Sequence, residues 1–267
     1  MAPSSTTGVA PAVLLAVDVG NTQTHVGLYS GSELVEHWRF ATARHATADQ
    51  LAIELAALLG LRGAGFADVE ATIVSSVVPT LAQEYEQLLQ RYLDGAGALL
   101  GPWLRTGIPI RIDNPQELGP DRLANAVAAY ERFGGACIAV DFGTALNYDV
   151  VSADGEYLGG VISPGIEISL EALSQRAARL PRVDLEPPRT AIGKSTRHAI
   201  QSGVVFGYAG SVDGLVARIR EELGEEATAI ATGGFAHVIV PSCEQIDETD
   251  DLLTLEGLRL IWERNRS

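Results

Sequence analysis

The sequence predicts an α/β protein built from two similar halves, and three observations support that prediction. Short apolar runs typical of strands alternate with segments of helical spacing. The segment 16–20 (AVDVG) returns as 139–143 (AVDFG), with four of five residues identical and an offset of 123 residues in a chain of 267. Because a domain has roughly 150 residues, a chain of this length accommodates two such halves.

The first half is predicted to begin with a hairpin of two strands. The apolar run 13–17 and residues 25–29 flank a turn that contains Gly20 and Asn21, which is typical of such a hairpin. Leucines at helical spacing predict a helix over 47–59. The remaining predicted elements are a strand over 71–78, a helix over 81–92, and a loop with a short strand over 95–109.

The second half is predicted to repeat the hairpin after an Ala-rich helix over 123–133. Gly134 and Gly135 end that helix. The hairpin spans 137–151, with its turn after Asp141. The further predicted elements are a helix over 167–179, an irregular loop over 181–193, a helix over 195–223, a strand over 228–231 and an amphipathic helix over 252–262.

These patterns divide the chain into a leader and two domains. Residues 1–12 are predicted to be a disordered leader rather than a signal peptide, since they lack a basic segment. The two domains are predicted at 13–118 and 119–267, with the terminal helix free to pack back on the first domain. The longest early apolar run, 12–17, is far too short to span a membrane.

Composition excludes several classes of protein. The chain has 34 acidic and 19 basic residues and a net charge of −15, so we expect neither a nucleic-acid partner nor binding to a membrane surface. Cys137 and Cys243 form no CxxC motif, and the histidines show no HxxxH pair. The pattern therefore predicts neither a zinc site nor a disulfide framework, and it suits a reduced cytoplasmic protein.

The repeated hairpin is suited to binding phosphate. A glycine turn after a strand-ending aspartate can direct several backbone N–H groups at phosphate oxygens by adopting positive φ. Asn21, Thr22 and Thr144 would add side-chain donors, and Asp18 and Asp141 could hold the cation that accompanies a nucleoside triphosphate. Two such turns would face each other across a cleft. The alternative is that each is an ordinary hairpin turn, because Asp and Gly are common there.

A second glycine motif, in contrast, does not support a phosphate-binding P-loop. The segment 192–196 (IGKST) has the end of a phosphate-binding P-loop, but Pro188 stands where that motif requires its first glycine. No GxGxxG fingerprint of a dinucleotide fold occurs. The turn 232–234 (TGG) follows a predicted strand and would suit a ribose or phosphate.

Taken together, the motifs resemble those of type III pantothenate kinases, members of the superfamily of acetate and sugar kinases, heat-shock ATPases and actin. The resemblance extends from about residue 14 to residue 265. Its motifs are, in order, DVGNT at 18–22, SSVVP at 75–79, DNP at 113–115, GPDR at 119–122, DFGTA at 141–145, GGVISPG at 159–165, LP at 180–181, IGKST at 192–196 and TGG at 232–234.

The resemblance implies two ribonuclease-H-like halves with a nucleotide cleft between them. It also implies a kinase that uses ATP to phosphorylate pantothenate to 4′-phosphopantothenate, the first step of coenzyme A synthesis. The ATP contacts that it implies are Asp18, Val19, Gly20, Asn21, Thr22, Gln23, Thr24, His25 and Thr144.

The resemblance also implies a substrate site and two cations. Its catalytic base is Asp121, and its pantothenate-binding residues are Gly119, Pro120, Asp121, Arg122 and Thr196. Asp141 would bind a monovalent cation, K⁺ or NH₄⁺, while Mg²⁺ would accompany ATP. The family implies a homodimer with the substrate site near the subunit interface, and the Ala-rich helix after Asp121 offers a face for close packing.

Alternatives remain for the principal residues and for the function. Asp121 could be a helix N-cap, Arg122 could form a surface ion pair, and Asp18 and Asp141 could cap turns. Four residues depart from the family pattern and bear on substrate affinity: Ile112, Pro120, Leu146 and Asn147. The alternative functions are a kinase for another small hydroxylated substrate and a nucleotide-binding regulatory protein without turnover.

Overall fold

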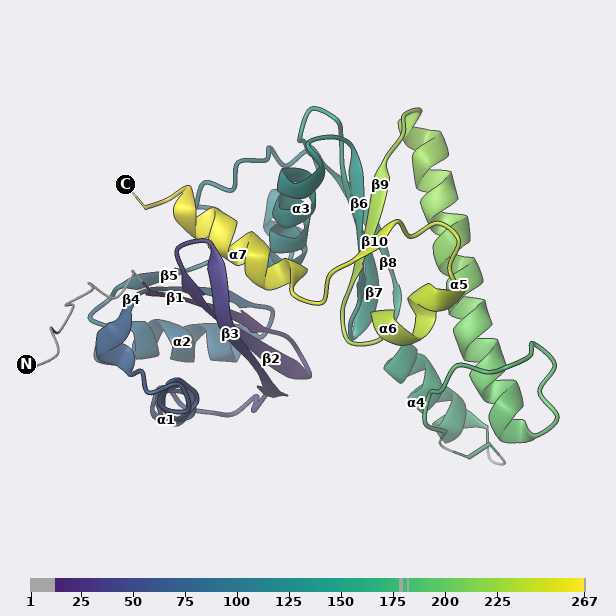
Figure 1. Ribbon diagram of the computed structural model, residues 1–267, viewed down its shortest axis with the longest axis horizontal. Helices are drawn as coiled ribbons and strands as arrows, with labels where there is room; N and C mark the ends of the chain where they lie inside the picture. Colours follow the sequence, from purple (N-terminus) through teal and green to yellow (C-terminus); the bar gives the residue numbers. More distant parts are fainter. Residues whose placement is uncertain (1–12, 178–179, 182, 267) are drawn as a thin grey trace, which may run out of the picture. The chain divides into compact units, whose positions relative to one another are not determined.

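The computed structural model describes residues 13–177, 180–181 and 183–266, and these fall into two compact units that divide between Leu104 and Arg105. The predicted leader 1–12 lies outside the described residues, as does residue 179, where the helix predicted over 167–179 would end. Each unit holds one five-stranded mixed sheet with helices packed on it (Figure 1).

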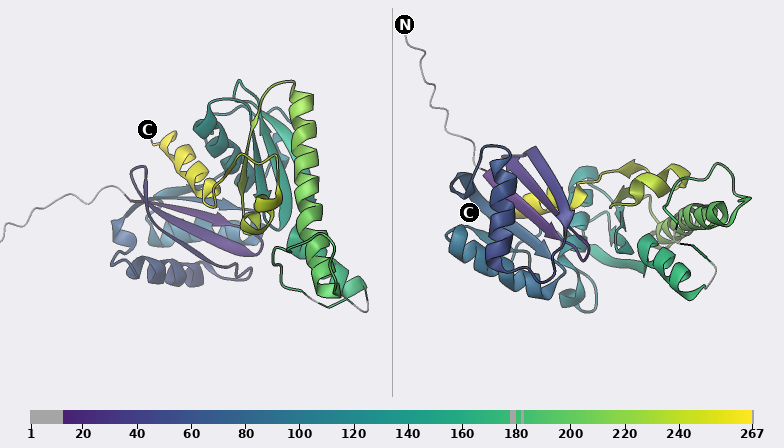
Figure 2. Two further views of the ribbon diagram at one scale, coloured as in Figure 1. Left: turned by 45° about the vertical axis from the view of Figure 1, so that its right-hand side comes forward. Right: turned by 90° about the horizontal axis from the view of Figure 1, so that it is seen from below.

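The N-terminal unit has its helices α1 and α2 on one face of its sheet (Figures 1 and 2). Thr47 caps α1, and its side chain and that of Gln50 form a reciprocal capping box. Leucines of both helices meet the apolar side chains of β1, β2 and β4 in one core. The elements of this unit are β1 (Val13–Val19), β2 (Gln23–Ser30), β3 (Glu33–Ala41), α1 (Ala48–Gly60), β4 (Val69–Ser76), α2 (Pro79–Tyr92) and β5 (Gly97–Leu99), with a short 3₁₀ turn at Phe66–Asp68.

The C-terminal unit has helices on both faces of its sheet (Figure 1). One face packs against the long helix α5, and the other against α3. The elements of this unit are α3 (Pro120–Phe133), β6 (Cys137–Phe142), β7 (Ala145–Val151), β8 (Tyr157–Pro164), α4 (Ile166–Arg176), α5 (Thr196–Leu223), β9 (Thr228–Thr232), α6 (Ala236–Ile239), β10 (Glu248–Thr249) and α7 (Leu253–Glu263), with 3₁₀ turns at Pro115–Glu117 and Val240–Ser242.

The two sheets have the same topology, which confirms the internal repeat. The first has the order β3-β2-β1-β4-β5, and the second, read from its other edge, β8-β7-β6-β9-β10. In each sheet the first strand pairs antiparallel with the second and parallel with the fourth. The repeated pentapeptide therefore lies on corresponding central strands, β1 and β6.

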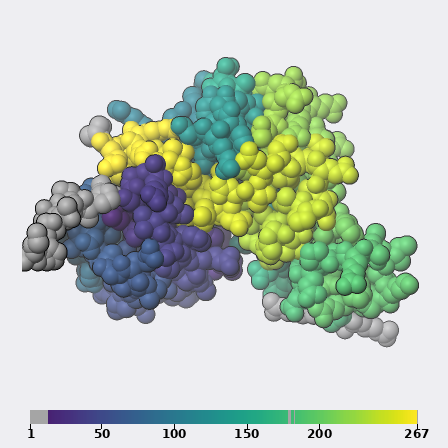
Figure 3. Space-filling model, in the orientation of Figure 1, coloured from purple at the N-terminus to yellow at the C-terminus, as the bar shows by residue number. Residues whose placement is uncertain are grey.

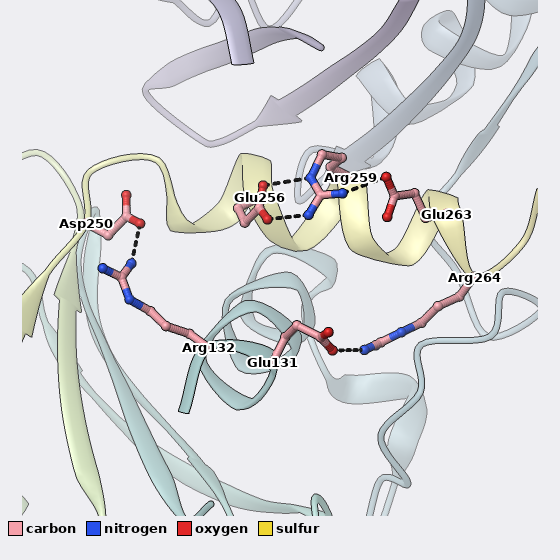
Figure 4. Close-up of polar contacts among 7 residues, drawn as sticks. All are labelled: Glu131, Arg132, Asp250, Glu256, Arg259, Glu263 and Arg264. Atoms are coloured by element: carbon pink, nitrogen blue, oxygen red, sulfur yellow. Dashed lines mark hydrogen bonds and ion pairs between the residues drawn. The ribbon is translucent and has the colours of Figure 1, made fainter. Parts of the chain in front are cut away.

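The terminal helix α7 packs on α3 within the C-terminal unit (Figure 3). Gly257 allows the close approach, since a Cβ there would lie 2.0 Å from the carbonyl oxygen of Ala124. Figure 4 shows two ion pairs that flank this contact, Arg132 to Asp250 at 2.8 Å and Arg264 to Glu131 at 2.6 Å. It also shows Arg259 held between Glu256 and Glu263 on α7 itself.

Two expectations about α3 are corrected. The helix begins at Pro120, three residues before the predicted start, because Gly119 is the N-cap and proline suits the first helical position. The Ala-rich face expected to serve a homodimer is buried inside this unit, where α3 packs against α7, β6 and β7. That face is therefore not available to a second chain.

The remaining elements agree closely with the predicted ones, apart from β3, β8, α6 and β10, which were not predicted. Strand β3 pairs with β2 from Gln23 opposite Ala41 to Ser30 opposite Glu33. Among the helices of residues 13–177 and 183–266, none has the length and apolar character needed to cross a membrane.

Candidate active site

The two repeated aspartates occupy equivalent positions in their sheets. Asp18 lies one residue before the end of β1, opposite His25 on β2 and Ser75 on β4. Asp141 lies one residue before the end of β6, opposite Asn147 on β7 and Thr232 on β9. Each carboxylate thus stands where a hairpin turn begins.

The turn after Asp18 is held by side chains from the end of β3 and the segment beyond it. Thr42 donates a hydrogen bond of 2.8 Å from its hydroxyl to the carbonyl oxygen of Gly20, and its hydroxyl lies 2.9 Å from that of Thr24. Arg44 donates from Nε and Nη2 to the carbonyl oxygen of Asn21 at 3.1 and 3.0 Å. The loop expected to bind ATP is therefore fixed from outside the motif.

Position 20 requires glycine because the turn leaves no room for a side chain, and not because the backbone there has a positive φ. Neither Gly20 nor Gly143 has a positive φ, so the expectation of left-handed glycines in these turns is wrong. A Cβ at Gly20 would lie 2.8 Å from the carbonyl oxygen of Gln23, which accepts the N–H of Gly20 at 3.0 Å. The turn is too tight for any side chain at that position.

A glycine with positive φ does occur near Asp141, at Gly233 in the turn that follows β9. Its φ is +93°, and a Cβ there would lie 2.4 Å from Oδ1 of Asp141. The carboxylate of Asp141 therefore approaches the backbone of the predicted TGG turn. Thr144 is exposed in the turn between β6 and β7, and Gly165 packs against its carbonyl oxygen.

Asp121 and Arg122 lie in the first turn of α3. Asp121 is the second residue of the helix, and the N-cap is Gly119. The alternative that Asp121 is the helix N-cap is therefore wrong. Its Oδ1 accepts the N–H of Arg122 at 2.8 Å. Arg122 forms a largely buried ion pair with Asp149 and not a surface one, since 15% of its side chain and none of the Asp149 side chain is exposed.

The carboxylates of Asp121, Asp141 and Asp149 are close enough to influence one another. Burial raises the pKa of Asp121, and the N–H of Arg122 opposes that effect. Burial, with the charges of Asp121 and Asp149, raises the pKa of Asp141 to about 7, while Asn125 lowers it. Burial raises the pKa of Asp149 to about 6 despite the opposing effects of Arg122 and Tyr157. The cluster concentrates negative charge in the C-terminal unit.

Asn125 is linked to the terminal helix. Its side chain is fully buried on α3, one helical turn after Asp121. Its Oδ1 accepts a hydrogen bond of 2.7 Å from the hydroxyl of Thr254 on α7. Helix α7 thereby fixes the orientation of the amide that lowers the pKa of Asp141.

Thr196 is not joined to this cluster. It is the first residue of α5, is exposed, and follows the N-cap Ser195. Within residues 13–177, 180–181 and 183–266 it forms no hydrogen bond with Asp121, Arg122 or Asp141. Lys194, in the rejected P-loop segment, is exposed.

Three residues that form hydrogen bonds with predicted site residues or with one another escaped the sequence analysis: Arg44, Asp149 and Tyr157. Arg44 lies 23 residues from its partner Asn21, so no local pattern marks it. Asp149 did leave a signal, since a carboxylate within the apolar run 148–151 needs a buried partner. That partner comes from another element, which the pattern cannot identify.

The donor set suits a cation that arrives with a nucleotide. In the described part of the chain no group of three or more His, Cys, Asp or Glu side chains is arranged to hold a metal ion. Mg²⁺ in phosphate-transfer sites usually needs only one or two protein carboxylates and retains several waters. Burial and the nearby carboxylates of Asp121 and Asp149 disfavour the charge of Asp141, and a bound cation would offset both effects.

Comparison with known protein sequences identifies the family of this chain. The sequence model for type III pantothenate kinase matches residues 14–218. The type III pantothenate kinase of Frankia alni is 50% identical over 254 residues, covering 95% of this chain and 100% of that relative. That of Streptomyces griseus is 49% identical over 263 residues, covering 96% and 99%.

Solved structures confirm the predicted two-half α/β fold. A Baf family protein from Campylobacter jejuni has a TM-score of 0.59 at 20% identity, covering 94% of this chain and 98% of that one. A polyphosphate/ATP-glucomannokinase from Arthrobacter has a TM-score of 0.51 at 15% identity, covering 95% and 98%. At such identities the likeness concerns the fold alone. The family match and the near-full-length identities confirm the predicted kinase, and the chain belongs to the type III pantothenate kinase family.

Proposed function

We propose that the chain transfers the γ-phosphoryl group of ATP to the hydroxyl of pantothenate, the first step of coenzyme A synthesis, with Asp121 as the base. In phosphoryl transfer the protein forms few covalent bonds itself, so catalysis depends mainly on positioning the reactants and stabilising the charge of the transition state. The observation that carries this proposal is the cluster of Asp121, Arg122 and Asp141, which come from two separate motifs. The charge of Asp121 acts on both Arg122 and Asp141.

Asp121 orients the pantothenate hydroxyl and accepts its proton. Burial raises the pKa of this carboxyl, which brings it nearer to the operating pH, as a general base requires. Its Oδ1 is held by the N–H of Arg122, so the carboxylate has a defined direction. Gly119 supports that geometry, because a Cβ there would lie 2.6 Å from Oδ1 of Asp121.

Arg122 binds the pantothenate carboxylate, and the residues of the same turn, Gly119 and Pro120, shape the site. A guanidinium offers a planar set of donors that matches a carboxylate. Thr196 contacts the substrate from the start of α5. This last assignment rests on the family motif, because Thr196 is not bonded to the cluster around Asp121.

The loop from Asp18 to His25 and the hydroxyl of Thr144 bind ATP. The loop is the end of a strand followed by a tight turn, held by Thr42 and Arg44. Asp141 binds a monovalent cation, K⁺ or NH₄⁺, and Mg²⁺ enters with ATP. These cations supply the positive charge that offsets the phosphates, which a chain with a net charge of −15 needs.

The enzyme acts as a homodimer in the cytoplasm. Its two cysteines are free thiols, which suits a reducing compartment. Strand β8 is an edge strand and carries the exposed side chains of Leu158 and Ile162. Ile162 shares a face with Gly160 by strand alternation, and Gly160 borders Arg122. A register shift between the pairs Val150–Gly159 and Val151–Tyr157 leaves Leu158 outside this alternation. An interface on this face would lie beside the substrate site.

The test is a coupled kinase assay with pantothenate in buffers that contain K⁺, NH₄⁺ or only Na⁺. We expect 4′-phosphopantothenate to form with ATP and Mg²⁺, and the rate to rise strongly with K⁺ or NH₄⁺. Asp141→Ala should abolish the response to K⁺. Equal rates in K⁺ and Na⁺ would refute the cation assignment, whereas ATP binding without phosphorylation of pantothenate or of a panel of hydroxylated acids would favour a regulatory protein.

A further inference from the structure

The guanidinium of Arg122 is held on one edge by a buried acceptor. Its Nε donates to Oδ1 of Asp149 at 2.8 Å, and its Nη2 lies 2.7 Å from the same oxygen. The hydroxyl of Tyr157 donates to that oxygen too, at 2.7 Å. One carboxylate oxygen thus receives donors from two elements, α3 and β8.

The backbone of β8 makes room for this arrangement. Gly160 pairs with Asp149 across the β7–β8 ladder. A Cβ at Gly160 would lie 3.0 Å from Nη2 of Arg122 and 1.7 Å from the carbonyl oxygen of Tyr148. The guanidinium therefore lies over a position on β8 where no side chain fits.

A contribution to stability does not by itself explain the buried ion pair between Arg122 and Asp149. Burying an ion pair costs desolvation that the attraction often fails to offset. Here the second oxygen of Asp149, Oδ2, is also buried and accepts no hydrogen bond from any described residue. What the contacts do provide is a fixed orientation, because the Nε–Nη2 edge is engaged while Nη1 makes no hydrogen bond within the described part of the chain.

We infer that Asp149 and Tyr157 are positioning residues that hold Arg122 by its Nε–Nη2 edge and present Nη1 to the carboxylate of pantothenate. This inference rests on the proposed role of Arg122. A guanidinium that is already oriented loses less conformational freedom when substrate binds. Asp149 and Tyr157 thus act on substrate affinity through Arg122, without touching the substrate.

The test compares the KM for pantothenate, the KM for ATP and kcat in matched variants. Tyr157→Phe removes one hydroxyl and should raise the KM for pantothenate about 3- to 10-fold, the effect of one hydrogen bond. Asp149→Asn removes the charge and should raise it about 10- to 100-fold. The KM for ATP should stay within about 2-fold of the wild-type value, because both residues act through Arg122, which is not among the residues proposed to bind ATP.

Tyr148→Phe is the matched control. Tyr148 is the neighbour of Asp149 on β7, is fully buried, and its hydroxyl forms no hydrogen bond with a described residue. Its removal should leave the KM for pantothenate unchanged. If Asp149→Asn fails to fold, Tyr157→Phe still decides the question.

A double-mutant cycle separates positioning from a general structural role. In an Arg122→Met background, Tyr157→Phe should cause no further rise in the KM for pantothenate, because the residue that it positions is absent. An equal rise in both backgrounds, or no rise in the single variant, would overturn the inference. If Arg122→Met itself leaves the KM unchanged, the proposed role of Arg122 fails instead.

Discussion

Arg44 donates three hydrogen bonds to Asn21, two to its backbone oxygen and one of 3.2 Å to its side-chain oxygen. This places a guanidinium against the turn proposed to bind ATP, in a motif that contains no lysine or arginine of its own. The segment that follows β3 thus holds the turn by hydrogen bonds and also adds a positive charge beside it.

Arg44→Met should weaken ATP binding by about 3- to 10-fold, the effect of losing one or two hydrogen bonds to a charged donor. Methionine keeps the unbranched stem but removes the donors and the charge. The dissociation constant of ATP, measured by calorimetry, checks this expectation. The matched control is Arg62→Met, because Arg62 lies in the same unit and forms only an exposed ion pair with Glu36. Unchanged ATP affinity in Arg44→Met would contradict it.

The sequence predicted the repeated framework because that framework is local. Strand runs, glycine turns and capping residues are set by neighbours in the chain, so β1, β6 and the helices at 48–60 and 196–223 were predicted within a few residues. The family motif likewise marked Asp121 and Arg122. These features need no knowledge of which strands pair.

The residues that escaped prediction act across the fold. Arg44 reaches a turn 23 residues earlier, and Asp149 reaches Arg122 from another element. The Ala-rich face of α3 was misassigned for the same reason. A small-residue face indicates that something packs closely, and only the structure identifies that neighbour as Gly257 on α7.

The homodimer gives a prediction about β8. Light scattering should give a mass of two chains of 28.2 kDa, and Ile162→Asp should shift it toward one chain, since a charge in an apolar interface is costly. Ile162 is 62% exposed on an edge strand. Ile53→Asp is the control, because Ile53 is 71% exposed on α1. A wild-type mass of one chain would refute the dimer.

Asp149 gives a prediction about stability and pH. Burial raises its pKa from 3.8 to about 6 in the folded chain, so between about pH 4 and pH 6 the folded state binds more protons than the unfolded state. The contribution of Asp149 to stability is therefore lost as pH rises through this window. At about 1.4 kcal/mol per pKa unit, the change is on the order of 2 to 3 kcal/mol.

Asp149→Asn removes that dependence, since asparagine does not titrate. The difference in unfolding free energy between wild type and Asp149→Asn, measured by urea titration from pH 4 to pH 7, should shift in favour of the variant as pH rises. Asp154→Asn, at an exposed turn position, serves as the control. Parallel pH profiles for wild type and Asp149→Asn would show that the folded chain does not perturb Asp149.

Asp121→Asn tests the base. A positioned general base contributes roughly 10²- to 10⁴-fold in rate, so kcat with pantothenate should fall by about that factor. Asparagine keeps an oxygen that can accept the N–H of Arg122, and Gly119 is the N-cap, so the melting temperature and ATP affinity should change little. Glu131→Gln, on the same helix, is the control and should keep full turnover. If Asp121 served only the helix, Asn would preserve both stability and rate, so near wild-type turnover in Asp121→Asn would remove it from catalysis and leave it a residue of the first helical turn.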